Sequence, residues 1–184
     1  MDTCEKVKQI KRSFRLEMNG ITSRSMREKG VGYHLNWGVP YVRLKEMAKP
    51  YGEDADLALA LWREDIRECK IMAALIMPPS RMTASLASEW MAQVRTQEMA
   101  EMLAFNLIQH IPDARQLAFG WIETSEPLRQ IAGLHVLTRL LRKGEICEQA
   151  CRERLSRRCE ELLGEGSLGV RHAAMNTLFA FDEW

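Results

Sequence analysis

The sequence has few aromatic residues, few prolines and almost no net charge. Phenylalanine, tryptophan and tyrosine make up 7% of the 184 residues, there are six prolines, and the formal net charge is +1. The near-neutral balance means that a nucleic-acid partner would have to be bound by basic residues gathered on one face. Long stretches free of proline, rich in alanine, leucine and methionine, favour an all-helical chain, because these residues lose little rotamer freedom in a helix.

Long apolar runs and paired cysteines are also lacking. No stretch approaches the roughly 20 apolar residues that cross a bilayer, and the segment up to Glu17 is charged, unlike a secretory leader. The five cysteines are odd in number and scattered, which is not typical of a disulfide framework. We therefore expect a cytoplasmic protein without a membrane partner.

No motif for a metal, a cofactor or nucleotide hydrolysis is present. The sequence contains neither a His-Glu-x-x-His pair nor a phosphate-binding glycine loop of the Walker type. Cys147 and Cys151 are four residues apart, but a tetrahedral zinc site needs four ligands, and no suitably spaced histidine accompanies them. We expect buried thiols, no metal and no nucleotide cofactor.

Apolar residues recur at steps of three and four along the whole chain, which is typical of amphipathic helices. The first helix carries Val7, Ile10, Phe14 and Met18 between lysines and arginines, and Gly20 is a candidate C-cap. Connections of a few residues predict that consecutive helices are antiparallel neighbours. Further helices are predicted over residues 23–28, 41–49, 54–62, 65–77, 82–94, 97–109, 112–123, 126–142, 146–163 and 168–181, with Asp54 and Asp65 as N-caps.

A weak repeat places a basic residue three positions before an alanine near the start of three helices. The copies are Lys70-x-x-Ala73, Arg129-x-x-Ala132 and Arg171-x-x-Ala174. Stacked helix pairs produce such recurrence, since one pair alone cannot bury its apolar face. We predict an all-α, curved solenoid of antiparallel HEAT-like helix pairs, forming a single domain over residues 1–184, with capping helices over 1–30 and stacked pairs over 31–184.

The basic residues of this repeat are candidate phosphate ligands. Lys70, Arg129 and Arg171 would line one face and contact a DNA backbone, because phosphate contacts need no sequence motif. The alternative is that they reach solvent or a neighbouring carboxylate. Arg43 and Lys45 extend the predicted DNA-binding set, although their spacing does not place them on one face.

Residues 30–40 form the one loop that is rich in both glycine and aromatic residues. Tyr33 and Trp37 lie in it, and Pro40 suits the first turn of the next helix. Trp37 has two interpretations: it packs on deoxyribose or a groove edge, or it covers the end of the first helix pair.

The segment over residues 26–77 contains a distinctive set of motifs. They are Met26-Arg27-Glu28-Lys29-Gly30, Tyr33, Asn36-Trp37-Gly38-Val39-Pro40, Arg43-Leu44-Lys45-Glu46-Met47-Ala48-Lys49, Leu61-Trp62 and Ile66-Arg67-Glu68-Cys69-Lys70-Ile71-Met72-Ala73. With these motifs the segment resembles the N-terminal part of AlkD-type DNA alkylation repair proteins, and a looser likeness continues to about Leu141.

The resemblance implies HEAT-like pairs that cradle double-stranded DNA. Enzymes of this family hydrolyse the N-glycosidic bond of N3- or N7-alkylated purines, whose positive charge already makes the base a good leaving group. A carboxylate then stabilises the sugar cation and positions a water molecule. The family does not flip the base into a deep pocket, and it uses no cofactor.

The resemblance also assigns roles to particular residues. The family has a Trp-Asp pair followed three residues later by a catalytic Asp, and the corresponding residues are Gln97, Glu98 and Glu101. Its arginine pair corresponds to Arg129-Gln130, so Glu101 is the candidate catalytic residue and Arg129 the phosphate ligand. The alternatives are a DNA-binding solenoid that has lost the glycosylase residues, and a protein-interaction solenoid, which the near-neutral charge favours.

Overall fold

The computed structural model describes residues 2–30 and 32–182, and the side chains of all of these except Asp182. Val31 of the predicted loop, Met1, Glu183 and Trp184 lie outside the described residues. The chain divides into two compact units, unit 1 over residues 1–81 and unit 2 over residues 82–184. The prediction of a single domain over 1–184 stays a prediction.

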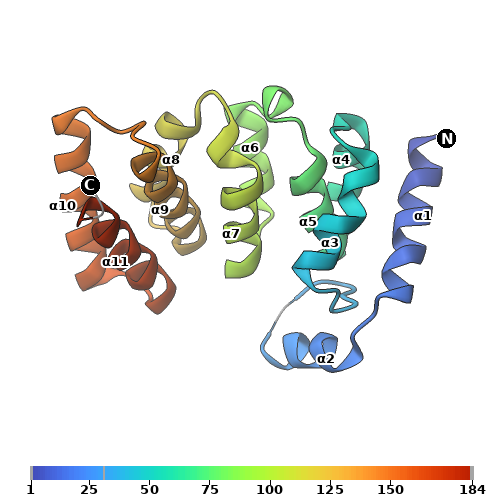
Figure 1. The fold of residues 1–184 in the computed structure, drawn as a ribbon. Coiled ribbons are helices and arrows are strands. Elements are labelled where there is room, and N and C mark those ends of the chain that lie inside the picture. Colours follow the sequence, from blue (N-terminus) through green and yellow to red (C-terminus); the bar gives the residue numbers. More distant parts are fainter. Residues whose placement is uncertain (1, 31, 183–184) are drawn as a thin grey trace. The chain divides into compact units, whose positions relative to one another are not determined.

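Unit 1 is built from five α-helices and two short 3₁₀ helices within the described residues (Figure 1). Helix α4 packs against both α1 and α5, and α3 packs against α5. Phe14 and Ile10 of α1 and Leu57 and Leu61 of α4 are fully buried. The helices are α1 (Thr3–Leu16), α2 (Gly20–Glu28), α3 (Tyr41–Ala48), α4 (Ala55–Trp62) and α5 (Arg67–Ile76), with η1 (Lys49–Tyr51) and η2 (Pro79–Arg81).

Unit 2 is built around α9, which packs against α7, α8 and α11, while α10 packs against α11. Gly133 allows the close approach of α8 and α9, because a Cβ atom there would lie 2.8 Å from the carbonyl oxygen of Ala118. The helices are α6 (Ala84–Ala92), α7 (Gln97–Asn106), η3 (Ile108–His110), α8 (Ala114–Ile122), α9 (Pro127–Arg142), α10 (Gln149–Glu165) and α11 (Leu168–Asp182).

The prediction of an all-α chain of helix pairs is confirmed, and each predicted helix is present with shifted ends. Asp54 caps α4 as expected, its Oδ1 accepting the amide of Leu57 at 3.0 Å. Gly20 is not a C-cap: α1 ends at Leu16, and Gly20 begins α2 behind the N-cap Asn19. The structure describes no helix long and apolar enough to cross a membrane.

Asp65 does not cap α5. The N-cap is Ile66, and the Asp65 carboxylate instead accepts the amide of His34 at 3.2 Å. Leu35 and Ile66 form an isolated parallel bridge. The loop before α3 therefore pairs with the N-cap residue of α5. The amide of His34 in this loop donates to the Asp65 carboxylate.

A buried carboxylate fixes this loop, here called the aromatic loop (residues 32–40), onto α5. Glu68 is fully buried and accepts the amides of Trp37 and Val39, each at 3.2 Å. Arg67, also buried, donates to Glu68 and to the carbonyl of Val39, both at 3.1 Å. Gly38 has φ +70°, and a Cβ atom there would lie 2.6 Å from the carbonyl oxygen of Asn19.

Candidate nucleic-acid interface

Glu101 lies on α7 facing α9. Its side chain is 27% exposed and lies 3.7 Å from Nε2 of His135 on α9. Gln97, one turn earlier on α7, donates from Nε2 to the Glu101 carboxylate at 2.8 Å. The carboxylate is therefore held in place by two neighbours and still meets solvent.

The charge of His135 depends on its burial. Burial lowers the pKa of His135, Glu101 raises it, and Arg139 and His172 lower it further. The net pKa lies below the usual value, so the imidazole is neutral near pH 7. Neutral His135 accepts or donates a hydrogen bond without adding a charge beside Glu101.

A small pocket, here called the unit 2 pocket, adjoins His135 and is lined by two arginines. Arg139 extends over the ring of Phe105, with Cζ 4.2 Å from the ring centroid, and the edge of the same ring meets His135 at 4.9 Å between centroids. The Arg139 Nε is buried and makes no hydrogen bond with a described residue. The pocket has a volume of about 310 Å³ and is lined by Phe105, His135, Thr138, Arg139, Arg142 and Asn176.

The beginning of α11 lies against the same helices. A Cβ atom at Gly169 would lie 2.5 Å from Oε1 of Gln97 and 3.0 Å from Cδ1 of Ile131. Arg171 follows two residues later and is exposed. Arg129, two residues before Ile131, is 19% exposed and donates from Nε to Glu126 at 2.9 Å. Unit 2 therefore gathers Glu101, Arg129 and Arg171 on three neighbouring helices.

The repeat places its three alanines alike and its basic residues differently. Ala73, Ala132 and Ala174 are each fully buried. Lys70 is only 6% exposed, and its Nζ donates to the carbonyl of Trp62 at 2.8 Å. The ammonium also lies 4.4 Å from the centroid of the Trp62 ring. Lys70 thus stabilises the junction of α4 and α5, and we do not propose it as a phosphate ligand.

The predicted DNA-binding residues of α3 lie at the surface of unit 1. Arg43 forms a two-bond pair with Glu17, from Nε at 3.1 Å and from Nη2 at 2.5 Å, and this hydrogen bonding lowers the pKa of Glu17. Lys45 is exposed, with Nζ 6.0 Å from the Tyr41 ring centroid. Both residues belong to unit 1, whereas the pocket beside His135 belongs to unit 2.

Trp37 covers the end of the first helix pair, and its contact with DNA stays a prediction. It is 6% exposed and packs on Phe14 of α1 with ring centroids 5.6 Å apart, as expected of an aromatic that covers a helix end. It also lines a pocket of about 540 Å³ together with basic residues of α1. Among the described side chains no cluster of three or more histidine, cysteine or acidic residues is placed to hold a metal ion.

Sequence reasoning missed His135, Arg139 and Arg142. They follow one another at steps of four and three on α9, so they share one face of a helix that is otherwise mostly buried. Three polar residues at helical spacing inside an apolar helix were the available signal. Their environment was not foreseeable, because the Phe105 ring that orders His135 and Arg139 belongs to another helix.

Comparison with known proteins places this arrangement in a family. One solved structure matches with a TM-score of 0.86 and 18% sequence identity, over 98% of this chain and 75% of the other. It is described as one of a new family of proteins related to the HEAT-like repeat DNA glycosylases, with affinity for branched DNA structures. This likeness confirms the predicted HEAT-like repeat fold, whereas none of the curated proteins compared with the chain matches it. The family model of the DNA alkylation repair enzymes matches residues 10–179, and the chain therefore belongs to that family.

Proposed function

We propose that the protein binds DNA of the kind on which alkylation-repair proteins act. A backbone phosphate of this DNA lies in the unit 2 pocket. The observation that carries this proposal is that Arg139 lines the pocket with its guanidinium held over the Phe105 ring, and that its Nε makes no hydrogen bond with a described residue. Arginine offers the planar fork of donors that phosphate binds best.

The surroundings of Arg139 support a phosphate diester rather than a carboxylate ligand. Arg142 and Asn176 supply further donors at the same pocket, and exposed Arg171 begins the neighbouring helix. Several cationic contacts spaced over adjacent helices suit a backbone that repeats its charge. The solved relative has affinity for branched DNA, and we extend DNA binding, including double-stranded DNA, to this chain.

A second candidate function is removal of a cationic, N3- or N7-alkylated purine at Glu101. The specific observation is that the Glu101 carboxylate is partly exposed and is held by Gln97 and His135. His135 also lines the unit 2 pocket. A fixed carboxylate beside a phosphate site would stabilise the positive charge that develops on deoxyribose as the base leaves. The family's tryptophan stacking face is replaced by Gln97, so the sugar would be positioned mainly through its phosphate.

DNA binding is tested by titrating a labelled duplex with protein at several salt concentrations. The logarithm of the association constant should fall linearly with the logarithm of salt concentration. Arg139→Gln should weaken binding about tenfold, whereas Arg157→Gln, an equal charge change on the exposed side of α10, should have little effect. Equal losses in the two variants, or no binding by the wild type, would leave the protein-interaction alternative.

Base removal is tested on DNA that carries 7-methylguanine or 3-methyladenine. Release of the free base should be lost in Glu101→Gln and kept in Glu89→Gln, the same change at an exposed glutamate of α6. Duplex affinity should be kept in both variants. Binding without base release by the wild type would support the non-catalytic alternative and end the assignment of Glu101.

A further inference from the structure

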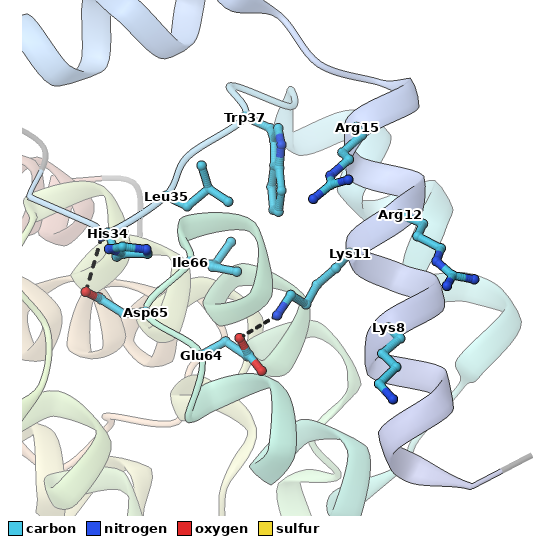
Figure 2. Close-up of a pocket in the computed structure, with 10 residues that line it drawn as sticks. All are labelled: Lys8, Lys11, Arg12, Arg15, His34, Leu35, Trp37, Glu64, Asp65 and Ile66. Atoms are coloured by element: carbon cyan, nitrogen blue, oxygen red, sulfur yellow. Dashed lines mark hydrogen bonds and ion pairs between the residues drawn. The ribbon is translucent and has the colours of Figure 1, made fainter.

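The pocket beneath α1 has no role in the proposed function and lies wholly within unit 1. We call it the α1 pocket. Its volume of about 540 Å³ falls within the range of roughly 300–1,000 Å³ found for small-molecule sites. Figure 2 shows that its basic residues come from one helix, with Lys11 directed to Glu64 between α4 and α5 and Arg15 directed to Trp37 of the aromatic loop.

One wall is a row of four cations. They recur at steps of three, one and three, so they share one face of α1. Lys11 is already paired, its Nζ lying 2.9 Å from Glu64. The other three are exposed and make no ion pair with a described side chain; they are Lys8, Arg12 and Arg15.

The floor of the pocket is apolar and fixed. It consists of Trp37, Leu35 and Ile66. The Leu35–Ile66 bridge and the hydrogen bond from the Trp37 amide to Glu68 hold these residues in place before any ligand arrives. Arg15 points from α1 toward Trp37 (Figure 2). A flat ring that lies on this floor would therefore have a cation within reach.

The far wall carries two carboxylates, Glu64 and Asp65. A carboxylate oxygen only accepts hydrogen bonds, and the Glu64 carboxylate has more acceptor sites than its pair with Lys11 uses. A purely apolar anion, such as a fatty acid, would meet this wall at a cost. A ligand that fits all three walls has an anionic end, a flat apolar body and N–H donors.

We propose that the α1 pocket holds one unpaired nucleotide of a nucleic-acid strand. Its phosphate lies on Arg12 and Arg15, and its base lies on the floor formed with Trp37. The exocyclic amine of adenine, cytosine or guanine donates to the carboxylate wall. A base inside a duplex cannot make these contacts, because its amine and its faces are already used in pairing and stacking. The α1 pocket therefore adds recognition of a single strand to the proposed binding of duplex DNA.

The experiment compares ligands that share parts of this chemistry. Calorimetric titration of the full chain is done with a deoxyadenosine hexanucleotide, deoxyadenosine monophosphate, deoxyadenosine, inorganic phosphate and a fully paired, blunt-ended duplex. We expect the monophosphate to bind at least about tenfold more tightly than deoxyadenosine or phosphate alone, since it joins both contacts. The hexanucleotide distinguishes a nucleotide within a strand, which should bind more tightly than the free monophosphate.

Two variants of α1 with the same change in net charge locate the site. Arg15→Gln should weaken binding of the hexanucleotide about tenfold. Gln9→Glu, on the exposed side of α1 and outside the pocket, should weaken it by less than about twofold at physiological salt. The introduced glutamine and glutamate are both good helix formers, so unfolding of α1 would not account for a difference in affinity between the two variants.

Three outcomes would overturn the proposal. They are absence of binding by both the hexanucleotide and the monophosphate, phosphate binding as tight as that of the monophosphate, and equal losses in the two variants. Binding of the blunt-ended duplex is a separate result. If the duplex binds while the single-strand ligands fail, the α1 pocket is refuted and the proposed duplex binding stands. If only the duplex fails to bind, the proposed duplex binding is refuted and the α1 pocket stands.

Discussion

The buried carboxylate of Glu68 accepts the backbone amide of Trp37, 31 residues earlier in the chain, at 3.2 Å. The same carboxylate also accepts the amide of Val39 and pairs with Arg67. One side chain thus joins the aromatic loop to α5 and positions the floor of the α1 pocket. The arrangement explains why an acidic residue occupies a fully buried position in unit 1.

Glu68→Ala should be strongly destabilising. The substitution leaves Arg67 buried without its carboxylate and two loop amides without acceptors, so we expect the free energy of unfolding to fall by about 3–5 kcal/mol. Urea denaturation measures the change. The matched control is Glu46→Ala, which breaks an exposed pair with Lys49 and should leave the free energy of unfolding nearly unchanged. Similar losses of unfolding free energy in the two variants would show that Glu68 does not hold the aromatic loop on α5.

His135 should make unit 2 less stable on acidification. Its folded pKa lies below the ordinary value, chiefly because it is buried, so the unfolded chain takes up the proton at a higher pH than the folded one. The free energy of unfolding therefore decreases as pH falls below about 6.5 toward the folded pKa. In His135→Gln this part of the pH dependence should disappear, as measured by denaturation at a series of pH values.

Glu101→Gln should enlarge the pH dependence of stability that His135→Gln removes. The Glu101 carboxylate raises the pKa of His135 and so opposes the effect of burial. Without that charge the folded pKa drops further, and the loss of stability should extend to lower pH than in the wild type. Titration of the His135 ring protons by NMR checks the shift directly. An unchanged midpoint would mean that the two groups do not interact in solution.

The cap of α4 should distinguish asparagine from alanine. Asp54 accepts the amide of Leu57 and lies 2.6 Å from the ammonium of Lys6. Asp54→Ala removes both contacts and should cost about 1–2 kcal/mol, whereas Asp54→Asn keeps a capping oxygen and should cost less. The hydrogen bond from Lys6 is the main reason why the pKa of Asp54 is lowered. The advantage of aspartate over asparagine should therefore vanish as pH falls below the Asp54 pKa.

Arg171 should contribute one ionic contact to DNA. It is exposed in the first turn of α11, two residues after Gly169, which packs against Gln97 and Ile131. Arg171→Gln should reduce the slope of log affinity against log salt by about 1 and weaken all duplex sequences alike. Arg157→Gln should leave the slope unchanged, and a slope unchanged in both variants would remove Arg171 from the interface.

The helices could be predicted because their signals are local. The spacing of Val7, Ile10 and Phe14 specifies the buried side of α1, and Asp54 specifies the start of α4. Asp65 looks like an equally good cap, but the amide of His34 takes its carboxylate. The sequence around Asp65 contains no sign of this competition, since the competing amide lies 31 residues away.

The candidate site was predictable in part for the same reason. Family resemblance led to Glu101, and the repeat led to Arg129 and Arg171. The repeat also led to Lys70, whose ammonium is used inside unit 1 by Trp62. The sequence alone does not distinguish a basic side chain that faces solvent from one that donates to a buried carbonyl. His135 and Arg139 were missed because their role comes from Phe105 on a different helix.

The packing of α1 against α4 also bears on synthesis of the chain. Lys6 contacts Asp54 and Lys11 contacts Glu64, 48 and 53 residues later. At roughly 5–20 residues per second, α1 leaves the ribosome several seconds before its partner exists. During that interval Ile10 and Phe14, which end fully buried, are uncovered on the nascent chain. The abundant cations of α1 would then keep this segment soluble until α4 emerges, before the same cations form a wall of the finished pocket.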